Sequence, residues 1–501
     1  MKVFWHHYFK FNIIMNKSLT YTFLLSFFYS ISVFAQKGFA TKQYPQMYEN
    51  QNSAPADVIA TEKLLTPKEL VDININGMMS DPVLKNADWG FVVYDPKTKK
   101  VVSSYNESTP LVPASTTKLL TTETAINLLG ENFRWITQLE YSGEIDAEGT
   151  LNGNLYIVGS GDPLIGTGKA GSAKYGDIVN DFIYAISEEK GIKKINGDII
   201  IQTALFKENK TPFLPENIVW MDQNNYYLPV GTTKDIEPRN EKLLSSAKSS
   251  TDKKNKYYYV SPYVNKMVFT DDYAGSTYTT NLPDAPAYLA NSLRSNLIKR
   301  KLPISGKVIS KMSDSEPEAR KLITAYRSPT LSEIIKDTNK RSDNANAEAL
   351  LRMVGFQKKG DQSLESGRAV VTEHLAKAGF EMDGLTYIDG SGLSHSNKVT
   401  PLSQVKFLSS LMTSKYFNSF FSSLPIGGED GTLKRMFNES DASGRIFAKT
   451  GTLNKVKALT GFIKTDSGRT LAFSILVNKY SGSVSQVKRK MEELLEPVLK
   501  L

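Results

Sequence analysis

The chain has 501 residues, of which 40% are apolar and 23% charged, with a formal net charge of +9. This length predicts two or three domains, or one domain with a large insertion. The absence of cysteine excludes thiol enzymes and Cys-ligated zinc sites, and the four histidines have no metal-binding spacing. Lys and Arg are scattered along the chain, so no nucleic-acid partner is expected, only mild attraction to anionic envelope polymers.

The N-terminus has the pattern of an export signal. Lysines precede an acid-free apolar stretch at about residues 23–34, and Ala35 ends a cleavage-like pattern. The stretch is too short and too rich in Ser and Tyr for a spanning helix, although an uncleaved membrane anchor is the alternative. We therefore predict a signal peptide at 1–35 and a polar tether at 36–65. The protein should be exported to the periplasm or cell envelope, and peripheral membrane contact is allowed but not required.

The next elements predict a strand pair followed by a helix. Two strand-like runs, 90–94 and 101–105, flank an Asp-Pro-Lys turn. Pro113 precedes and Gly130 follows a stretch with helical apolar periodicity, which predicts a helix over 115–129.

Residues 135–320 form a block with mostly strands and turns, including 155–158 and 197–202, and a polar loop at 245–256 interrupts it. The rest of the chain is predicted to contain helices and then strands, at 331–340, 346–354, 364–378, 445–451, 459–464 and 470–477. A closing amphipathic helix at 483–496 is expected to pack on the core, with membrane anchoring as the alternative.

The first chemical candidate is Ser115 at the start of a helix, with Lys118 three residues later. Positions i and i+3 lie on one helical face, so the amine can reach the hydroxyl. A buried lysine loses its proton more easily and can then activate a serine, and a helix N-terminus directs N–H groups towards developing negative charge. The same spacing recurs elsewhere, for example at Ser187 and Lys190, so spacing alone is not specific.

The second candidate is the string Ser342-Asp343-Asn344. The alternative interpretation is a helix N-cap, because Ser, Asp and Asn are the preferred capping residues. The string alone favours the cap.

The third candidate is Lys449-Thr450-Gly451-Thr452, in a stretch with strand-like alternation. A period of two puts Lys449 and Gly451 on one face, where a glycine leaves room for a bound chain. The alternative is a strand that simply ends in a turn.

Together the three motifs resemble the ordered SxxK, SxN and KTG set of penicillin-recognising enzymes. More narrowly, the chain is similar to the class C low-molecular-mass penicillin-binding proteins, the D-alanyl-D-alanine carboxypeptidase/endopeptidase (DacB) family. Further matching strings are Gly159-Ser160-Gly161-Asp162-Pro163, Ala347-Glu348, Asp389-Gly390-Ser391-Gly392-Leu393-Ser394 and Asp430-Gly431-Thr432-Leu433.

This resemblance implies an α/β (α+β) fold, with a penicillin-binding/β-lactamase-like transpeptidase domain whose antiparallel sheet is flanked by helices. The catalytic domain would be split into residues 66–134 and 321–501 by a mostly β insert at 135–320. Its substrates would be peptidoglycan stem peptides, and β-lactam antibiotics would be covalent inhibitors.

The resemblance also assigns catalytic roles. Ser115 would be the nucleophile, Lys118 its base, and Ser342 a proton relay to the leaving amine. The backbone N–H groups of Ser115 and Thr452 would hold the oxyanion.

The remaining site residues would bind substrate. Asn344 would hydrogen-bond the peptide, Lys449 and Thr450 would hold its terminal carboxylate, and Gly451 and Thr452 would pair with it as an added strand.

Two alternatives remain at this point, a β-lactamase and a catalytically inactive peptidoglycan-binding protein. No cofactor or metal is expected. The glycine pattern at 166–171 is separated from the preceding strand by Pro163 and Leu164, whereas a dinucleotide site needs its glycines in the strand-to-helix turn.

Overall fold

The computed structural model describes residues 65–169, 171–202, 285–311, 318–360 and 362–501, and the backbone of short strands between residues 220 and 279. The predicted signal peptide, nearly all of the tether and most of the polar loop at 245–256 lie outside the described residues. None of the described helices is long and apolar enough to cross a bilayer.

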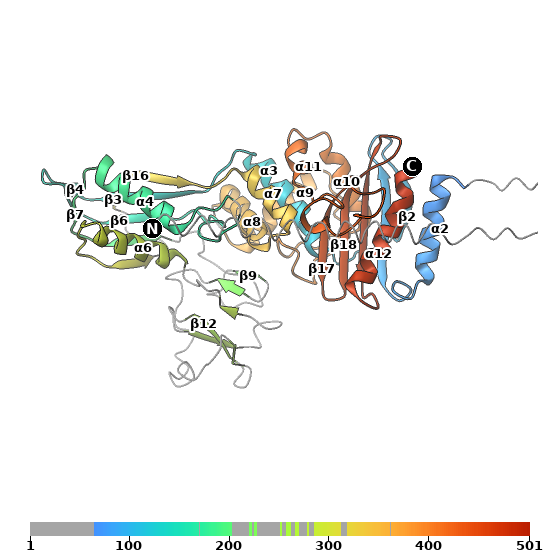
Figure 1. The fold of residues 1–501 in the computed structure, drawn as a ribbon, viewed down its shortest axis with the longest axis horizontal. Helices are drawn as coiled ribbons and strands as arrows, with labels where there is room; N and C mark the ends of the chain where they lie inside the picture. Colours follow the sequence, from blue (N-terminus) through green and yellow to red (C-terminus); the bar gives the residue numbers. More distant parts are fainter. Residues whose placement is uncertain are drawn as a thin grey trace, which may run out of the picture. The chain divides into compact units, whose positions relative to one another are not determined.

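The first sheet joins the two ends of the described chain. It has five antiparallel strands in the order β17-β18-β19-β1-β2 (Figure 1). The antiparallel sheet and its strand positions were predicted from sequence, and both are confirmed. The strands are β1 (Asp88–Asp95), β2 (Lys100–Tyr105), β17 (Ile446–Leu453), β18 (Val456–Lys464) and β19 (Thr470–Asn478).

Helices cover both faces of this sheet, because successive residues along β1, β18 and β19 point to opposite faces and nearly all of them are buried. Phe91 packs in one buried cluster with α2 (Pro67–Ser80) and α12 (Val484–Leu495). Its neighbour Val92 packs in the opposite cluster, which includes α10 (Pro401–Leu411). The closing helix α12 therefore packs on the core, as predicted.

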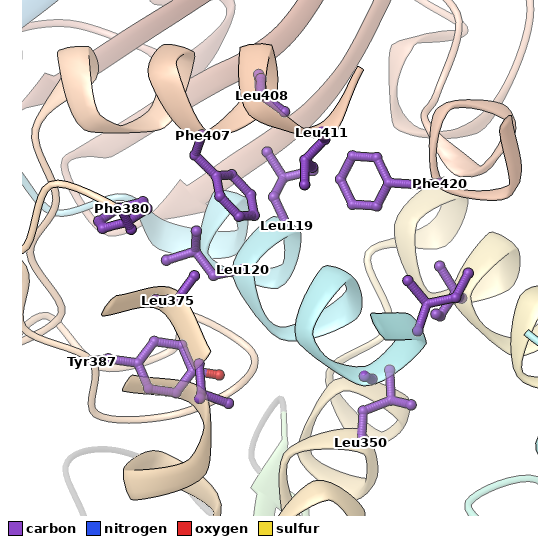
Figure 2. Close-up of a cluster of buried hydrophobic side chains, with 14 of the residues drawn as sticks. Leu119, Leu120, Leu350, Leu375, Phe380, Tyr387, Phe407, Leu408, Leu411 and Phe420 are labelled. Carbon is purple, nitrogen blue, oxygen red and sulfur yellow. The ribbon is translucent and has the colours of Figure 1, made fainter. Parts of the chain in front are cut away.

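A helical layer around α3 (Lys118–Leu129) forms the largest of the buried clusters in the described chain. Figure 2 shows Leu119 and Leu120 of α3 surrounded by side chains from the neighbouring helices. Nine consecutive residues of α3 are buried, so this helix is enclosed on all sides. The other helices of the layer are α7 (Leu331–Arg341), α8 (Asn344–Lys359), α9 (Leu364–Lys377) and α11 (Phe417–Ser423).

In a second five-stranded sheet, in the order β15-β8-β6-β3-β16, four strands lie within 135–320, whereas β16 begins at Arg320 and continues past the boundary predicted for the insert. The sheet is mixed, because β6, β8 and β15 are parallel to one another whereas β3 is antiparallel to β6 and β16. The helices α4 (Tyr175–Tyr184) and α6 (Ala285–Lys299) bury apolar residues in the same cluster as this sheet. Its strands are β3 (Ile136–Ser142), β6 (Leu155–Val158), β8 (Ile199–Gln202), β15 (Val308–Lys311) and β16 (Arg320–Arg327).

Short strands form three smaller sheets in the same region, each of three strands. They are β4 (Glu144–Ile145), β5 (Thr150–Asn152), β7 (Lys194–Ile195), β9 (Trp220–Asp222), β10 (Asn225–Tyr227), β11 (Thr251–Asp252), β12 (Tyr257–Ser261), β13 (Lys266–Phe269) and β14 (Tyr278–Thr279).

Candidate active site

Ser115 lies in a tight turn between a loop and a helix. The turn is a 3₁₀-helix, η1 (Ala114–Thr117), that leads directly into α3, and Ala114 adopts a left-handed φ of 47°. A side chain at Gly392 would come within 1.9 Å of the Ala114 carbonyl oxygen, and one at Gly451 within 2.7 Å of the Pro113 carbonyl oxygen. The space at Gly451, which we expected a bound chain to use, is therefore filled by the turn that carries Ser115.

A buried amide ties this turn to the first sheet. Gln404 of α10 donates from Nε2 to Thr116 Oγ1 over 3.0 Å. Its Oε1 accepts hydrogen bonds from Thr460 of β18 and Ser474 of β19, each at 2.8 Å. Because all four side chains are buried, these hydrogen bonds hold the turn in a fixed position relative to the sheet.

Lys118 is fully buried, and its amine contacts three segments of the chain. Nζ lies 3.1 Å from Ser115 Oγ, so the contact expected from the i, i+3 spacing is present. Nζ also donates to Asn344 Oδ1 and to the backbone carbonyl of Ser391, both over 2.6 Å.

The Ser342-Asp343-Asn344 string connects two helices. Ser342 ends α7 in a left-handed conformation, with φ of 61°, and Asp343 caps α8 by accepting from the backbone N–H of Asn346 at 2.9 Å. The capping interpretation is thus correct, and the cap places Asn344 against Lys118. Lys169, from the second-sheet region, forms an ion pair with Asp343 at 2.5 Å.

Ser342 belongs to the same string as Asn344, but its side chain is not hydrogen-bonded to the other candidate catalytic residues. Among the described residues, its hydroxyl makes no hydrogen bond to Ser115, Lys118 or Lys449. The structure therefore brings Ser115, Lys118 and Asn344 together and leaves Ser342 beside them.

Lys449 occupies a buried position on β17 and is 0% exposed. Its amine donates to the backbone carbonyl of the adjacent Thr450 over 2.8 Å. Within the described chain, no carboxylate forms an ion pair with it. Burial, and then the nearby cations of Lys118 and Lys457, lower the pKa of Lys449 well below its usual value.

The side chains of the two threonines in this motif are held from neighbouring segments. Thr450 donates from its hydroxyl to Thr432 over 2.7 Å, and Lys457 donates to the exposed Thr452 hydroxyl over 2.6 Å. Lys457 lies directly opposite Thr452 on β18. Burial, and then the cation of Lys488, lower the pKa of Lys457 to about 7.

Lys457 was missed from sequence, although a lysine inside an apolar strand is a recognisable signal. The loop at 389–394 was matched only as a string, with no role assigned. Asp389 accepts the backbone N–H groups of Gly392, Leu393 and Ser394, and this folding presents the Ser391 carbonyl to Lys118. Its two glycines indicate a backbone that approaches another segment closely, as Gly392 does.

Comparison with known proteins decides the family. The pattern of the D-Ala-D-Ala carboxypeptidase 3 (S13) family matches residues 71–236 and 239–497. The chain belongs to this family. The match extends through both sheets and includes all eight site residues proposed from the sequence.

Two relatives of this carboxypeptidase family cover most of the chain. D-alanyl-D-alanine carboxypeptidase DacB of Haemophilus influenzae is 26% identical over 460 residues, which is 85% of this chain and 92% of the relative. A D-alanyl-D-alanine carboxypeptidase of an Actinomadura species is 28% identical over 453 residues, 82% of this chain and 81% of the relative.

The fold is also similar to a solved one. The crystal structure of penicillin binding protein 4 (dacB) from Haemophilus influenzae superposes with a TM-score of 0.64 at 23% identity, covering 85% of this chain and all of that one. The same protein complexed with a β-lactam gives a TM-score of 0.63. At this identity the likeness shows the shared penicillin-binding fold, which confirms the predicted fold class.

Proposed function

We propose that this protein is an exported serine-type D-Ala-D-Ala carboxypeptidase/endopeptidase that acts on peptidoglycan stem peptides in the cell envelope. It forms an acyl-enzyme on Ser115 and is acylated there by β-lactams. The observation that carries this proposal is the buried Lys118 amine within hydrogen-bond distance of the Ser115 hydroxyl, in a chain of this carboxypeptidase family.

In the first step, neutral Lys118 takes the proton of the Ser115 hydroxyl as Oγ attacks the carbonyl carbon of the penultimate D-alanine. The backbone N–H groups of Ser115 and Thr452 hold the oxyanion. When the tetrahedral intermediate collapses, the C–N bond breaks, and the leaving D-alanine amine takes the proton of protonated Lys118 through Ser342, whose hydroxyl must first turn into hydrogen-bond reach of Lys118. Water then attacks the ester, releases the shortened peptide and restores Ser115.

The substrate lies along the outer edge of β17 beyond Ala448, because β17 is the terminal strand of the first sheet and its edge at Ile446 and Ala448 is already hydrogen-bonded to the 425–427 segment. Gly451 and Thr452 pair with the peptide backbone, and Asn344 donates to it. Lys449 and Thr450 bind the terminal carboxylate. The absence of an acid partner for Lys449 among the described residues supports this role, because burial alone disfavours its protonated form and a bound carboxylate would stabilise that form.

Fluorescent penicillin tests the nucleophile. We expect the wild type to be labelled covalently and Ser115→Ala to be unlabelled. Ser187→Ala is the matched control, because Ser187 has the same spacing to a lysine but lies in the second-sheet region. Labelling that persists in Ser115→Ala, or that maps to Ser342, contradicts the proposal.

Purified muropeptides test the reaction. Mass spectrometry should show loss of one D-alanine from pentapeptides, or cleavage of cross-linked dimers, by the wild type but not by Ser115→Ala. Rapid turnover of penicillin without either product would identify a β-lactamase instead. Binding of muropeptides without any product would identify an inactive binding protein.

A further inference from the structure

Besides the Ser115 hydroxyl, the Lys118 amine has two further acceptors, and α8 contacts both of them. Asn344, the first residue of α8, accepts from Lys118 directly, over 2.6 Å. Glu348 is four residues later and therefore lies on the same face of the helix. Its Oε1 accepts from the backbone N–H of Ser391 over 2.9 Å, and the carbonyl of Ser391 accepts from Lys118. Glu348 is therefore linked to the Lys118 amine indirectly, through the hydrogen bonds of Ser391.

In the loop that carries Ser391, the backbone N–H of Ser391 is bound by Glu348 and not by Asp389. Asp389 accepts the N–H groups that follow, from Gly392 at 2.5 Å, Leu393 at 3.1 Å and Ser394 at 2.7 Å. The Ser391 N–H points instead to Glu348, which is 6% exposed. Without that carboxyl, a buried N–H would lose its partner and the loop would have to shift.

We propose that Glu348 is a positioning residue for acyl transfer, which holds the Ser391 carbonyl against the Lys118 amine and modulates that amine by its own charge. This inference rests on the proposed role of Lys118 as the base. Glu348 does not contact the reacting atoms, so it acts only through Lys118.

Several charged or titratable groups face Glu348. Asp389 approaches from the loop, Arg352 from the next turn of α8, and Tyr387 from the segment before the loop, while Lys118 of α3 lies beyond the Ser391 peptide group. Burial, and then the charge of Asp389, raise the pKa of Glu348 to about 7. Glu348 therefore gains its charge as the pH rises through about 7. The resulting anion favours the protonated form of Lys118 and so opposes its action as base.

Two substitutions separate position from charge. Glu348→Gln keeps an oxygen acceptor for the Ser391 N–H and removes the charge, whereas Glu348→Ala removes both. Glu373→Gln on the exposed side of α9 is the matched control. For each variant, the second-order rate constant of acylation by fluorescent penicillin is measured from pH 5 to 9, together with the thermal unfolding transition.

We expect Glu348→Ala to lower the rate constant about tenfold or more while the protein remains folded, because the amine loses a fixed acceptor. Glu348→Gln should match the wild type within about threefold below pH 6 and exceed it by roughly threefold or more above pH 8. The rate constant of Glu348→Gln should begin to exceed that of the wild type as the pH rises through about 7, where Glu348 of the wild type gains its charge. Glu373→Gln should follow the wild type throughout.

A Glu348→Gln profile that superimposes on the wild type from pH 5 to 9 would overturn the inference. So would a loss of rate in Glu348→Ala that only matches its loss of folded protein. These failures are distinct from failure of the proposed function. If only the inference about Glu348 fails, penicillin still labels the wild type at Ser115. If Ser115 is not labelled, the proposed acyl-enzyme mechanism is wrong.

Discussion

Two fully buried lysines of the candidate site come from different elements, Lys118 from α3 and Lys449 from β17, and their surroundings differ. On the helical side, Lys118 meets acceptors from three segments: a hydroxyl, a side-chain amide oxygen and a backbone carbonyl. On the strand side, Lys449 has one hydrogen bond, to the carbonyl of the next residue, and the cations of Lys118 and Lys457 nearby. The amine of Lys118 is thus oriented by several acceptors. The equally buried amine of Lys449 has no carboxylate beside it among the described residues.

This difference in surroundings suits Lys118 to proton transfer and Lys449 to anion binding. A base must hold its amine at a fixed distance from the hydroxyl it deprotonates, and several acceptors provide that orientation. A carboxylate receptor needs an amine that the protein has not already paired with an acid, because the bound carboxylate can then stabilise the protonated lysine that burial alone disfavours. We therefore expect substitutions on the two sides to affect different steps.

The largest effect is expected on the helical side. Lys118→Ala should reduce the rate of acylation by penicillin about 10²–10⁴-fold, the usual contribution of general acid–base catalysis. Labelling kinetics measure the rate, and thermal unfolding shows whether the protein still folds. Lys118→Met fills more of the buried space and serves as a second variant, and Lys68→Ala, at an exposed position of α2, is the control. If activity falls only in step with the folded fraction, Lys118 is structural and the comparison fails.

An intermediate effect is expected on the strand side. Lys449→Ala should lower kcat/KM on a peptide that ends in free D-Ala-D-Ala by about 1.5–3 kcal/mol, or roughly one to two decades, because a charge-assisted contact is lost. The same peptide amidated at its C-terminus should be hydrolysed equally by variant and wild type, because it has no terminal charge. An equal penalty on both peptides would show that Lys449 supports the strand or tunes Ser115 instead.

The last effect concerns stability instead of catalysis and involves Lys457, the second buried lysine on the strand side. The folded-state pKa of Lys457 is about 7, below its ordinary value of 10.5, so between these values the unfolded chain binds a proton that the folded protein does not. The free energy of unfolding should rise with pH across this window, by at most about 1.4 kcal/mol per pH unit from this group. Below pH 7 both states are protonated and the contribution is constant.

Urea unfolding from pH 6 to 10 measures this contribution as the difference between the wild type and Lys457→Met. The difference should change with pH through the window for Lys457→Met. It should stay constant for Lys490→Met on α12, because ion pairing raises the pKa of Lys490. A constant difference for Lys457→Met would mean that Lys457 keeps its proton when buried, and that the strand side carries more charge than we infer.

Local patterns in the sequence were sufficient for several conclusions. Apolar patterning located the helix after Ser115 and the strands of the first sheet, because segments that are buried along most of their length are rich in apolar residues. The capping residues around Ser342 were also readable, since capping depends on neighbouring residues. The ordered motifs indicated the family, and the family match confirms it.

Contacts between distant segments were decided only by the tertiary structure. Nothing near Glu348 in the chain indicates that its carboxyl receives the Ser391 N–H, and nothing near Gly451 indicates that Pro113 occupies the adjacent space. Whether Lys457 is charged depends on its burial and on Lys488 of α12, more than 30 residues away in the chain. Hydrogen bonds, close packing and pKa shifts arise from atoms within a few ångströms. The sequence alone therefore named the motif residues, and the fold determined which groups surround each of them.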